Sequence, residues 1–165
     1  MRTVVITVVA LVSCFSQQVV SQTQEQDYSR SAVYAELGGQ GIFYTLNFDY
    51  RFTRHLCGRI GFTRFTLEDF FGSDLTITGF PLMAEYLVGG GNHSLELGAG
   101  GILVQGTSTF RFISASSKWG LVGTTTVGYR YQPSDGGLFF RVSIPAFFTS
   151  GGSGIWGGLS IGDAF

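Results

Sequence analysis

Lysine is almost absent from this 165-residue chain, because Lys118 is the only lysine among its ten basic residues. Charged residues make up 13% of the sequence, about half of the roughly 25% usual in soluble domains. A protein surrounded by water normally covers its surface with lysine and glutamate, and this chain has too few of both. Its net charge of −1 gives no reason to expect a nucleic-acid partner. These shortages argue against an ordinary soluble domain.

Long apolar segments are also missing beyond the first residues. Arg2 is followed by an apolar run at 3–15 and by the small-residue site 19–21 before Gln22, an order typical of a secretory signal peptide. The run is too short to cross a bilayer, which needs about 20 residues. No later stretch is long enough for a membrane helix, so any membrane span must consist of strands.

Cysteine is scarce, with only Cys14 and Cys57 present. The segment 11–14 (LVSC) resembles the lipobox of bacterial lipoproteins, so lipidation at Cys14 remains an alternative to ordinary cleavage after residue 21. Ordinary cleavage would leave Cys57 without a disulfide partner. One cysteine and two separated histidines do not form a metal-binding pattern, and we expect no cofactor. The predicted organisation is a signal peptide (1–21), a polar N-terminal lead (22–31) and one barrel domain (32–165).

Apolar residues beyond position 31 recur with a period of two, which predicts strands. Eight strands are predicted, at 33–38, 42–52, 56–63, 75–88, 94–104, 118–131, 138–147 and 155–165. Only the strand at 75–88 changes phase: Ile77 and Tyr86 have opposite parity, and Pro81 between them predicts a β-bulge.

The predicted connections alternate in length. Those at 53–55, 89–92 and 132–137 are compact, whereas those at 64–74, 105–117 and 148–154 are longer or more irregular. Short periplasmic turns that alternate with longer outer loops are typical of outer-membrane barrels. The loop at 38–41 is short where this pattern requires a long one. We therefore predict a single all-β, eight-stranded, antiparallel up-and-down transmembrane β-barrel.

Apolar and polar residues alternate in both membrane and soluble β-barrels, so alternation alone does not separate the two classes. The charged residues distinguish them. The polar faces of the predicted strands carry a balanced set of acids and arginines: Glu36, Asp49, Arg51, Arg59, Glu85, Glu96, Arg130 and Arg141. Arginine suits confined, bidentate pairing with carboxylates. Buried charges are tolerable where each finds a partner. The set therefore predicts a charge network inside a barrel whose apolar face contacts membrane lipid.

Five segments carry a resemblance to a known family: 33–39 (VYAELGG), 92–98 (NHSLELG), 127–131 (VGYRY), 137–141 (GLFFR) and 156–162 (WGGLSIG). They resemble the small outer-membrane β-barrel proteins of Bacteroidota. The resemblance implies a monomer in the outer membrane of a Gram-negative bacterium, inserted by the barrel-assembly machinery. Phe165 resembles the C-terminal aromatic residue that this machinery recognises. These motifs identify a fold and a location, and they imply no activity.

Catalytic motifs are not evident. His93, Ser94 and Glu96 are the residue types of a hydrolytic triad, but His93 and Ser94 are neighbours on a predicted strand and point to opposite faces. No phosphate loop or nucleophile elbow is present. We expect a non-catalytic structural barrel whose specific role lies in its surface loops. A lipid-modifying outer-membrane barrel enzyme and a soluble periplasmic ligand-binding β-barrel remain the alternatives.

Export processing is directly testable. Removal of residues 1–21 should leave a mature protein that begins at or near Gln22, because the apolar run and the small-residue site match signal cleavage. Intact mass spectrometry of protein purified from membranes measures this. A diacylglyceryl adduct on Cys14 would instead establish lipoprotein processing.

Overall fold

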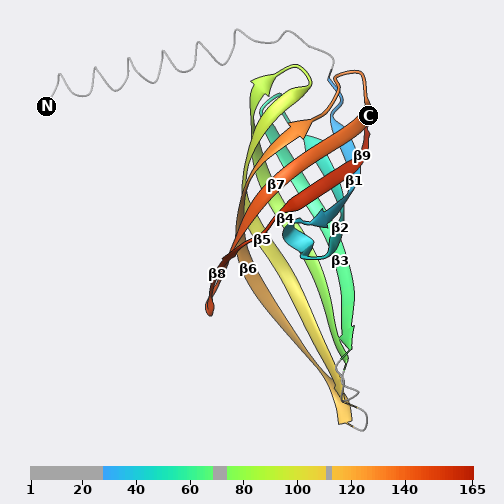
Figure 1. Ribbon diagram of the computed structural model, residues 1–165, viewed down its shortest axis with the longest axis vertical. Coiled ribbons are helices and arrows are strands. Elements are labelled where there is room, and N and C mark those ends of the chain that lie inside the picture. Colours follow the sequence, from blue (N-terminus) through green and yellow to red (C-terminus); the bar gives the residue numbers. More distant parts are fainter. Residues whose placement is uncertain (1–27, 69–73, 111–112) are drawn as a thin grey trace, which may run out of the picture.

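The chain forms a closed antiparallel β-barrel in a computed structural model that describes residues 28–68, 74–110 and 113–165 (Figure 1). Its strands are β1 (Ser31–Gly38), β2 (Tyr44–Arg51), β3 (Leu56–Glu68), β4 (Asp74–Gly90), β5 (His93–Phe110), β6 (Ile113–Tyr131), β7 (Gly137–Thr149), β8 (Gly152–Ile155) and β9 (Gly158–Ala164). Strands β1–β7 each pair with their neighbours in the chain, β9 pairs with β1 and β7, and the β6–β7 pairing closes the sheet. Short β8 pairs only with the end of β7, so eight strands form the barrel and the predicted fold is confirmed. None of the described residues belongs to a helix long and apolar enough to span a membrane.

The barrel is polar inside and apolar outside. Outward-facing Leu97 and Val142 are 45% and 42% exposed, whereas the adjacent Glu96 and Arg141 are fully buried. The largest fully buried side chains include two arginines and three glutamates, while most exposed large side chains are apolar. Soluble domains bury their apolar residues in the interior, so this barrel has the inverse arrangement.

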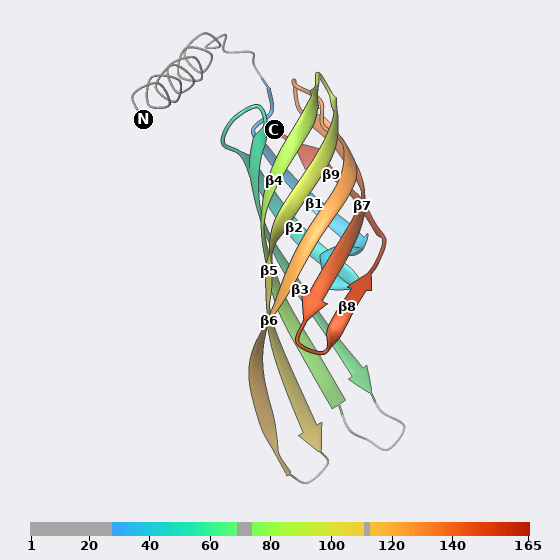
Figure 2. The ribbon, with the colours of Figure 1, turned by 90° about the vertical axis from the view of Figure 1, so that its left-hand side faces the viewer.

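Strands β3–β6 extend well beyond the rest of the barrel (Figure 2). They contain 13–19 residues each, whereas β1, β2 and β9 contain 7 or 8. The β2–β3 pairing ends at Leu46–Phe62 and the β6–β7 pairing at Gly123–Phe148. Beyond these pairs, the strand pairings of β3–β6 are only with one another, and the four segments form a sheet, here called the protruding sheet (residues 63–68, 74–79, 104–110 and 113–122). The predicted outer loops at 64–74 and 105–117 are therefore mostly strand, and their tips at 69–73 and 111–112 lie outside the described residues.

Strand β4 contains no bulge at Pro81, so that prediction is wrong. The β3–β4 register is the same at Ile60–Leu82 and at Thr63–Gly79, and the β4–β5 register is unbroken. The apolar residues change phase because β4 leaves the barrel. Within the barrel, the exposed apolar residues Leu82, Tyr86 and Val88 of β4 face outward, and Met83 and Leu87 are buried on the inward face. Ile77 shares this inward parity and lies on the inner face of the protruding sheet, opposite Phe65.

The short loop before β2 folds into the barrel. Residues Gly39–Gly41 form a buried 3-10 turn, η1, that contacts β4 and β7 across the barrel as well as its neighbours β1 and β2. Ile42 follows with a φ of +69° and Phe43 lies in a turn, so β2 begins at Tyr44 and not at residue 42 as predicted. A short loop is sufficient here because it turns inward instead of projecting outward.

The C-terminal segment also differs from the prediction of one strand at 155–165. The chain forms a β7–β8 hairpin over 146–155, with Ser150 and Gly151 at its turn, before β9 begins at Gly158. Between β8 and β9, Trp156 donates a hydrogen bond from its indole Nε1 to the carbonyl oxygen of Ile42 (3.1 Å). This contact ties the β8–β9 junction to the loop that contains η1.

The compact connections and both ends of the described chain lie at the other end of the barrel, here called the turn end (Figure 1). Residues 28–30 cross this end before β1 begins at Ser31. Buried Ser29 donates a hydrogen bond to the carbonyl oxygen of Pro133 (2.6 Å), and Gln132 donates one to the carbonyl oxygen of Ser29 (3.1 Å). Part of the lead is therefore fixed across the turn end.

The apolar outer face can be tested with two substitutions on one strand. Leu97 and Thr107 share the outward parity of β5, but Leu97 lies on the barrel and Thr107 on the protruding sheet. Leu97→Arg should destabilise the protein in bilayers by about 2–4 kcal/mol, against about 0–1 kcal/mol for Thr107→Arg. Denaturant titration in liposomes measures both, and equal costs would contradict this assignment of the outer face.

Candidate functional site

Seven of the eight sequence-predicted charged residues meet in one cluster inside the barrel. Here called the charged cluster, it comprises Glu36, Asp49, Arg59, Glu85, Glu96, Arg130 and Arg141. Each of the strands β1–β7 contributes one member, and every side chain in these ion pairs is at most 1% exposed. The cluster therefore links seven of the eight barrel strands.

Two arginines at the centre of the cluster lie directly opposite each other. Arg130 on β6 pairs in register with Arg141 on β7, and like charges in that position repel. The carboxylate of Glu96 bridges them, accepting hydrogen bonds from Arg130 Nε (2.8 Å) and Arg141 Nε (2.7 Å). Removal of this carboxylate would leave two buried guanidinium groups in mutual repulsion.

Glu36 closes the cluster on the side of η1. Its carboxylate accepts hydrogen bonds from Arg141 Nη1 (2.8 Å) and Ser143 Oγ (3.1 Å). Gly39 of η1 lies against it, since a Cβ at Gly39 would fall 2.1 Å from the carboxyl carbon. Gly39 also has a φ of +60°, which side-chain-bearing residues rarely adopt. Glycine is therefore required there, and η1 covers the cluster at close range.

Tyr34 and Phe139 extend the cluster, although sequence reasoning did not select them. The hydroxyl of Tyr34 donates to Asp49 Oδ1 (3.0 Å), and its ring stacks on Phe139 with centroids 4.4 Å apart. The guanidinium of Arg130 lies 5.2 Å from the centroid of Phe139. Parity assigns both aromatics to the interior, but only the folded barrel brings residues so distant in sequence together.

Arg51 is the predicted member that the structure places elsewhere. It takes part in none of the ion pairs among the described residues. It occupies the last position of β2, opposite Cys57 on β3 and one inward position closer to the turn end than Asp49. The cluster proper therefore contains four carboxylates and three guanidinium groups.

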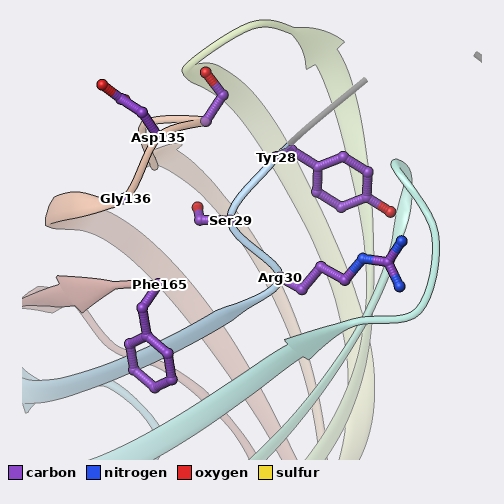
Figure 3. Close-up of a pocket in the computed structure, with 7 residues that line it drawn as sticks. Tyr28, Ser29, Arg30, Asp135, Gly136 and Phe165 are labelled. Carbon is purple, nitrogen blue, oxygen red and sulfur yellow. The ribbon is translucent and has the colours of Figure 1, made fainter. Parts of the chain in front are cut away.

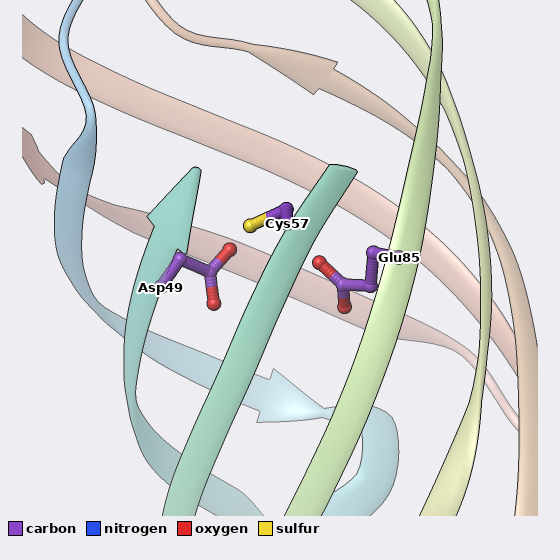
Figure 4. A group of neighbouring side chains, drawn as sticks. All are labelled: Asp49, Cys57 and Glu85. Carbon is purple, nitrogen blue, oxygen red and sulfur yellow. The ribbon is translucent and has the colours of Figure 1, made fainter. Parts of the chain in front are cut away.

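Asp49, Cys57 and Glu85 point toward one another from β2, β3 and β4 (Figure 4). One ligand atom from each lies within 4.8 Å of the others, which is close enough to hold a metal ion. However, Arg130 already contacts all three: it donates to Asp49 Oδ2 and to Glu85 Oε2 (2.7 Å), and its Nη1 lies 3.7 Å from Cys57 Sγ. The guanidinium group serves as the cation for this group of side chains.

The residue types of a hydrolytic triad are separated in space. His93 lies outside the barrel and its Nδ1 is 2.6 Å from the hydroxyl of Tyr129, whereas Ser94 and Glu96 face inward. Both oxygens of Glu96 are engaged by arginines. His55 is bound elsewhere, with its Nδ1 2.9 Å from the carbonyl oxygen of Leu87. These residues do not form a catalytic arrangement.

Phe165 lies beside a surface hollow of about 390 Å³ at the turn end (Figure 3), lined also by Tyr28, Ser29, Arg30, Ser134, Asp135 and Gly136. The backbone of Phe165 exchanges two 2.9 Å hydrogen bonds with Ser31, which join the C-terminus to the start of β1. Its side chain is 62% exposed and is therefore accessible from outside the barrel.

Solved structures identify the type of barrel. The N-terminal β-barrel domain of Pseudomonas aeruginosa OprF has a TM-score of 0.59 and 17% identity, covering 85% of this chain and 98% of its own. Ail, the attachment invasion locus protein of Yersinia pestis, solved with the heparin analogue sucrose octasulfate, has a TM-score of 0.54 and 16% identity (82% and 95% covered). Neisserial surface protein A has a TM-score of 0.52 and 15% identity (82% and 92% covered). The fold is that of the small outer-membrane β-barrels. No family model and no curated protein matches the sequence.

The partners of Arg141 in this small outer-membrane-type barrel can be tested by a double-mutant cycle. Arg141→Met should destabilise the protein by about 3–5 kcal/mol, because it leaves buried carboxylates unpaired. Adding Glu36→Gln should recover part of the loss, since Arg141 is the one described residue with which Glu36 forms an ion pair. Glu96 also pairs with Arg130, so adding Glu96→Gln should recover less. Urea unfolding in lipid of the wild type, the three single variants (Arg141→Met, Glu36→Gln and Glu96→Gln) and the two double variants measures these differences, and strictly additive effects would contradict the coupling.

Proposed function

We propose that the protein is a non-catalytic structural component of the outer membrane of a Gram-negative bacterium. In this proposal the barrel is a closed anchor in the lipid, and the specific role belongs to the protruding sheet on the cell surface. The observation that carries this proposal is that the outer face of β3–β6 changes from apolar to polar along the strands.

The outer face changes from apolar to polar across three successive rows of paired residues. The first row is apolar and contains Phe62, Phe80, Leu103 and Leu121. The next row contains Arg64, Thr78, Gln105 and Trp119, and the third contains Thr66, Thr76, Thr107 and Ser117. A lipid-facing surface is apolar and has aromatic residues at its boundary. The first row therefore supports a membrane boundary there, with the polar rows in water.

Strand length supports the same boundary. A membrane-spanning β-strand needs about 9–11 residues when tilted, and β4, β5 and β6 contain 17, 18 and 19. The excess residues form the protruding sheet. We therefore assign the role expected for surface loops to this hydrogen-bonded sheet, whose threonine- and serine-rich outer face is suited to polar contacts.

The barrel interior supports an anchor rather than a channel or an enzyme. An eight-stranded barrel is only wide enough for side chains to fill it, and here the charged cluster and η1 occupy its lumen. The separation of His93 from Ser94 and Glu96 weighs against a lipid-modifying enzyme. A soluble ligand-binding barrel would face its apolar side chains inward, which is the reverse of the arrangement of Leu97 and Glu96.

The route to the membrane is part of the proposal. The signal peptide at 1–21, the polar lead at 22–31, insertion by the barrel-assembly machinery through Phe165, and the monomeric state follow from the sequence and its resemblance to barrels of Bacteroidota. The exposed side chain of Phe165 is consistent with recognition before the barrel inserts.

Cysteine labelling in cells tests both orientation and surroundings. A membrane-impermeant maleimide should label Thr107→Cys on intact cells, because Thr107 lies on the protruding sheet. It should label Ser134→Cys at the turn end only after permeabilisation, and Leu97→Cys in neither case, because lipid covers this position.

The wild-type protein is the background control, since the side chain of Cys57 is fully buried. Labelling of Leu97→Cys as readily as Thr107→Cys would contradict the membrane anchor, because Leu97 is accessible only if no lipid surrounds the barrel. Labelling of Ser134→Cys on intact cells would reverse the proposed orientation.

A further inference from the structure

The turn end contains a small polar cavity, distinct from the charged cluster, that is lined by Tyr28, Arg51, Arg54, Gly89, Gly90, Gly91, Ser94 and Ser134. Two arginines and three hydroxyl-bearing residues face this space, and none of the described residues that line it is acidic. Its volume is about 60 Å³, roughly four to six times what one water molecule needs. A small ion fits this space, whereas a sugar or a peptide does not.

Arg51 points to the kind of ion. Its side chain lines the cavity and the residue is only 5% exposed, yet none of the described carboxylates forms an ion pair with it. Its Nε also lacks a hydrogen-bond partner. A buried guanidinium group is costly unless a counter-charge and hydrogen-bond acceptors satisfy it. In the same barrel, Arg59, Arg130 and Arg141 are all paired with carboxylates, so Arg51 is the exception among the interior arginines.

The lining favours a phosphate group over a carboxylate. Guanidinium groups bind phosphate oxygens in a bidentate manner, and Arg51 and Arg54 together supply two positive charges. The hydroxyls of Tyr28, Ser94 and Ser134 add donors for further oxygens, which a tetrahedral anion has and a carboxylate lacks. Glycines at 89–91 leave the space open: a Cβ at Gly90 or Gly91 would meet no atom within 4 Å.

We propose that this turn-end cavity is a binding site for a phosphate group. The group is either free inorganic phosphate or the headgroup phosphate of a phospholipid in the adjacent leaflet. The second source rests on the proposed membrane anchor, whereas the first does not.

The test uses the folded protein in phosphate-free maltoside micelles, with inorganic phosphate as the probe. Titration should shift the side-chain Nε–Hε NMR signals of Arg51 and Arg54 in a saturable manner. Sodium chloride at the same ionic strength should not reproduce the shifts. Arg54→Gln should weaken the affinity about tenfold or more, because it removes a charged hydrogen-bond donor. Arg30→Gln is the matched control, since Arg30 is an exposed arginine at the same end but outside the cavity lining, and it should leave the affinity within about twofold.

A second pair of variants avoids the buried Arg51, whose replacement could prevent folding. Ser134 is exposed and lines the cavity, so Ser134→Glu should place a competing carboxylate beside the arginines and abolish the phosphate response. Ser150→Glu adds the same charge at the exposed β7–β8 turn, at the other end of the barrel, and should leave the response unchanged.

The source of the phosphate follows from repeating the titration in phosphatidylglycerol nanodiscs. Suppression of the response there identifies the lipid headgroup, and an undiminished response identifies free phosphate. The proposal is overturned if phosphate causes no saturable shift in micelles, if acetate binds as tightly as phosphate, or if Arg30→Gln weakens binding as much as Arg54→Gln. Because these results are obtained in micelles, they do not depend on where the barrel resides in the cell.

Discussion

The bridge that Glu96 forms between Arg130 and Arg141 is the interaction on which the barrel interior depends. The antiparallel register of β6 and β7 places these two guanidinium groups opposite each other, and without a carboxylate between them this pairing would be repulsive. Once Glu96 holds them in place, Arg130 reaches Asp49 and Glu85, and Arg141 reaches Glu36. Ion pairs of this kind contribute little net stability, but the loss of one partner is costly. We therefore expect the cluster to act chiefly by disfavouring any strand register that would separate its members.

The membrane imposes the second constraint in the proposed setting, and it acts on the opposite face of the same strands. Lipid requires apolar side chains outside the barrel, whereas water beyond the lipid does not. Strands β3–β6 are continuous across this boundary. Their outer face changes from apolar to polar there, while their strand pairing continues unchanged. The apolar residues Phe65 and Ile77 then lie on the inner face of the protruding sheet. One set of strands thereby serves as an anchor and as a surface structure.

Arg51 illustrates how position within a strand decides the role of a charge. It shares the inward parity of Asp49, but it lies at the end of β2, and none of the described carboxylates forms an ion pair with it. The interior arginines therefore divide into a group with internal counter-charges and one residue that faces a cavity at the turn end. This division separates the structural charges from the one that is available to bind a ligand.

Local alternation in the sequence was enough to determine the all-β class, the number of barrel strands, and the inward or outward face of residues such as Glu96 and Leu97, because a strand repeats every two residues. It also selected all seven members of the charged cluster. Tertiary structure alone decided which charges pair, since partners such as Glu36 and Arg141 lie on strands far apart in sequence. It also showed that the change of apolar phase in β4 arises where the strand leaves the barrel and not from a bulge at Pro81. In addition, only the tertiary structure placed η1 inside the lumen. Periodicity reports which face of a strand is apolar, but only the folded barrel establishes whether that face meets lipid, water or another side chain.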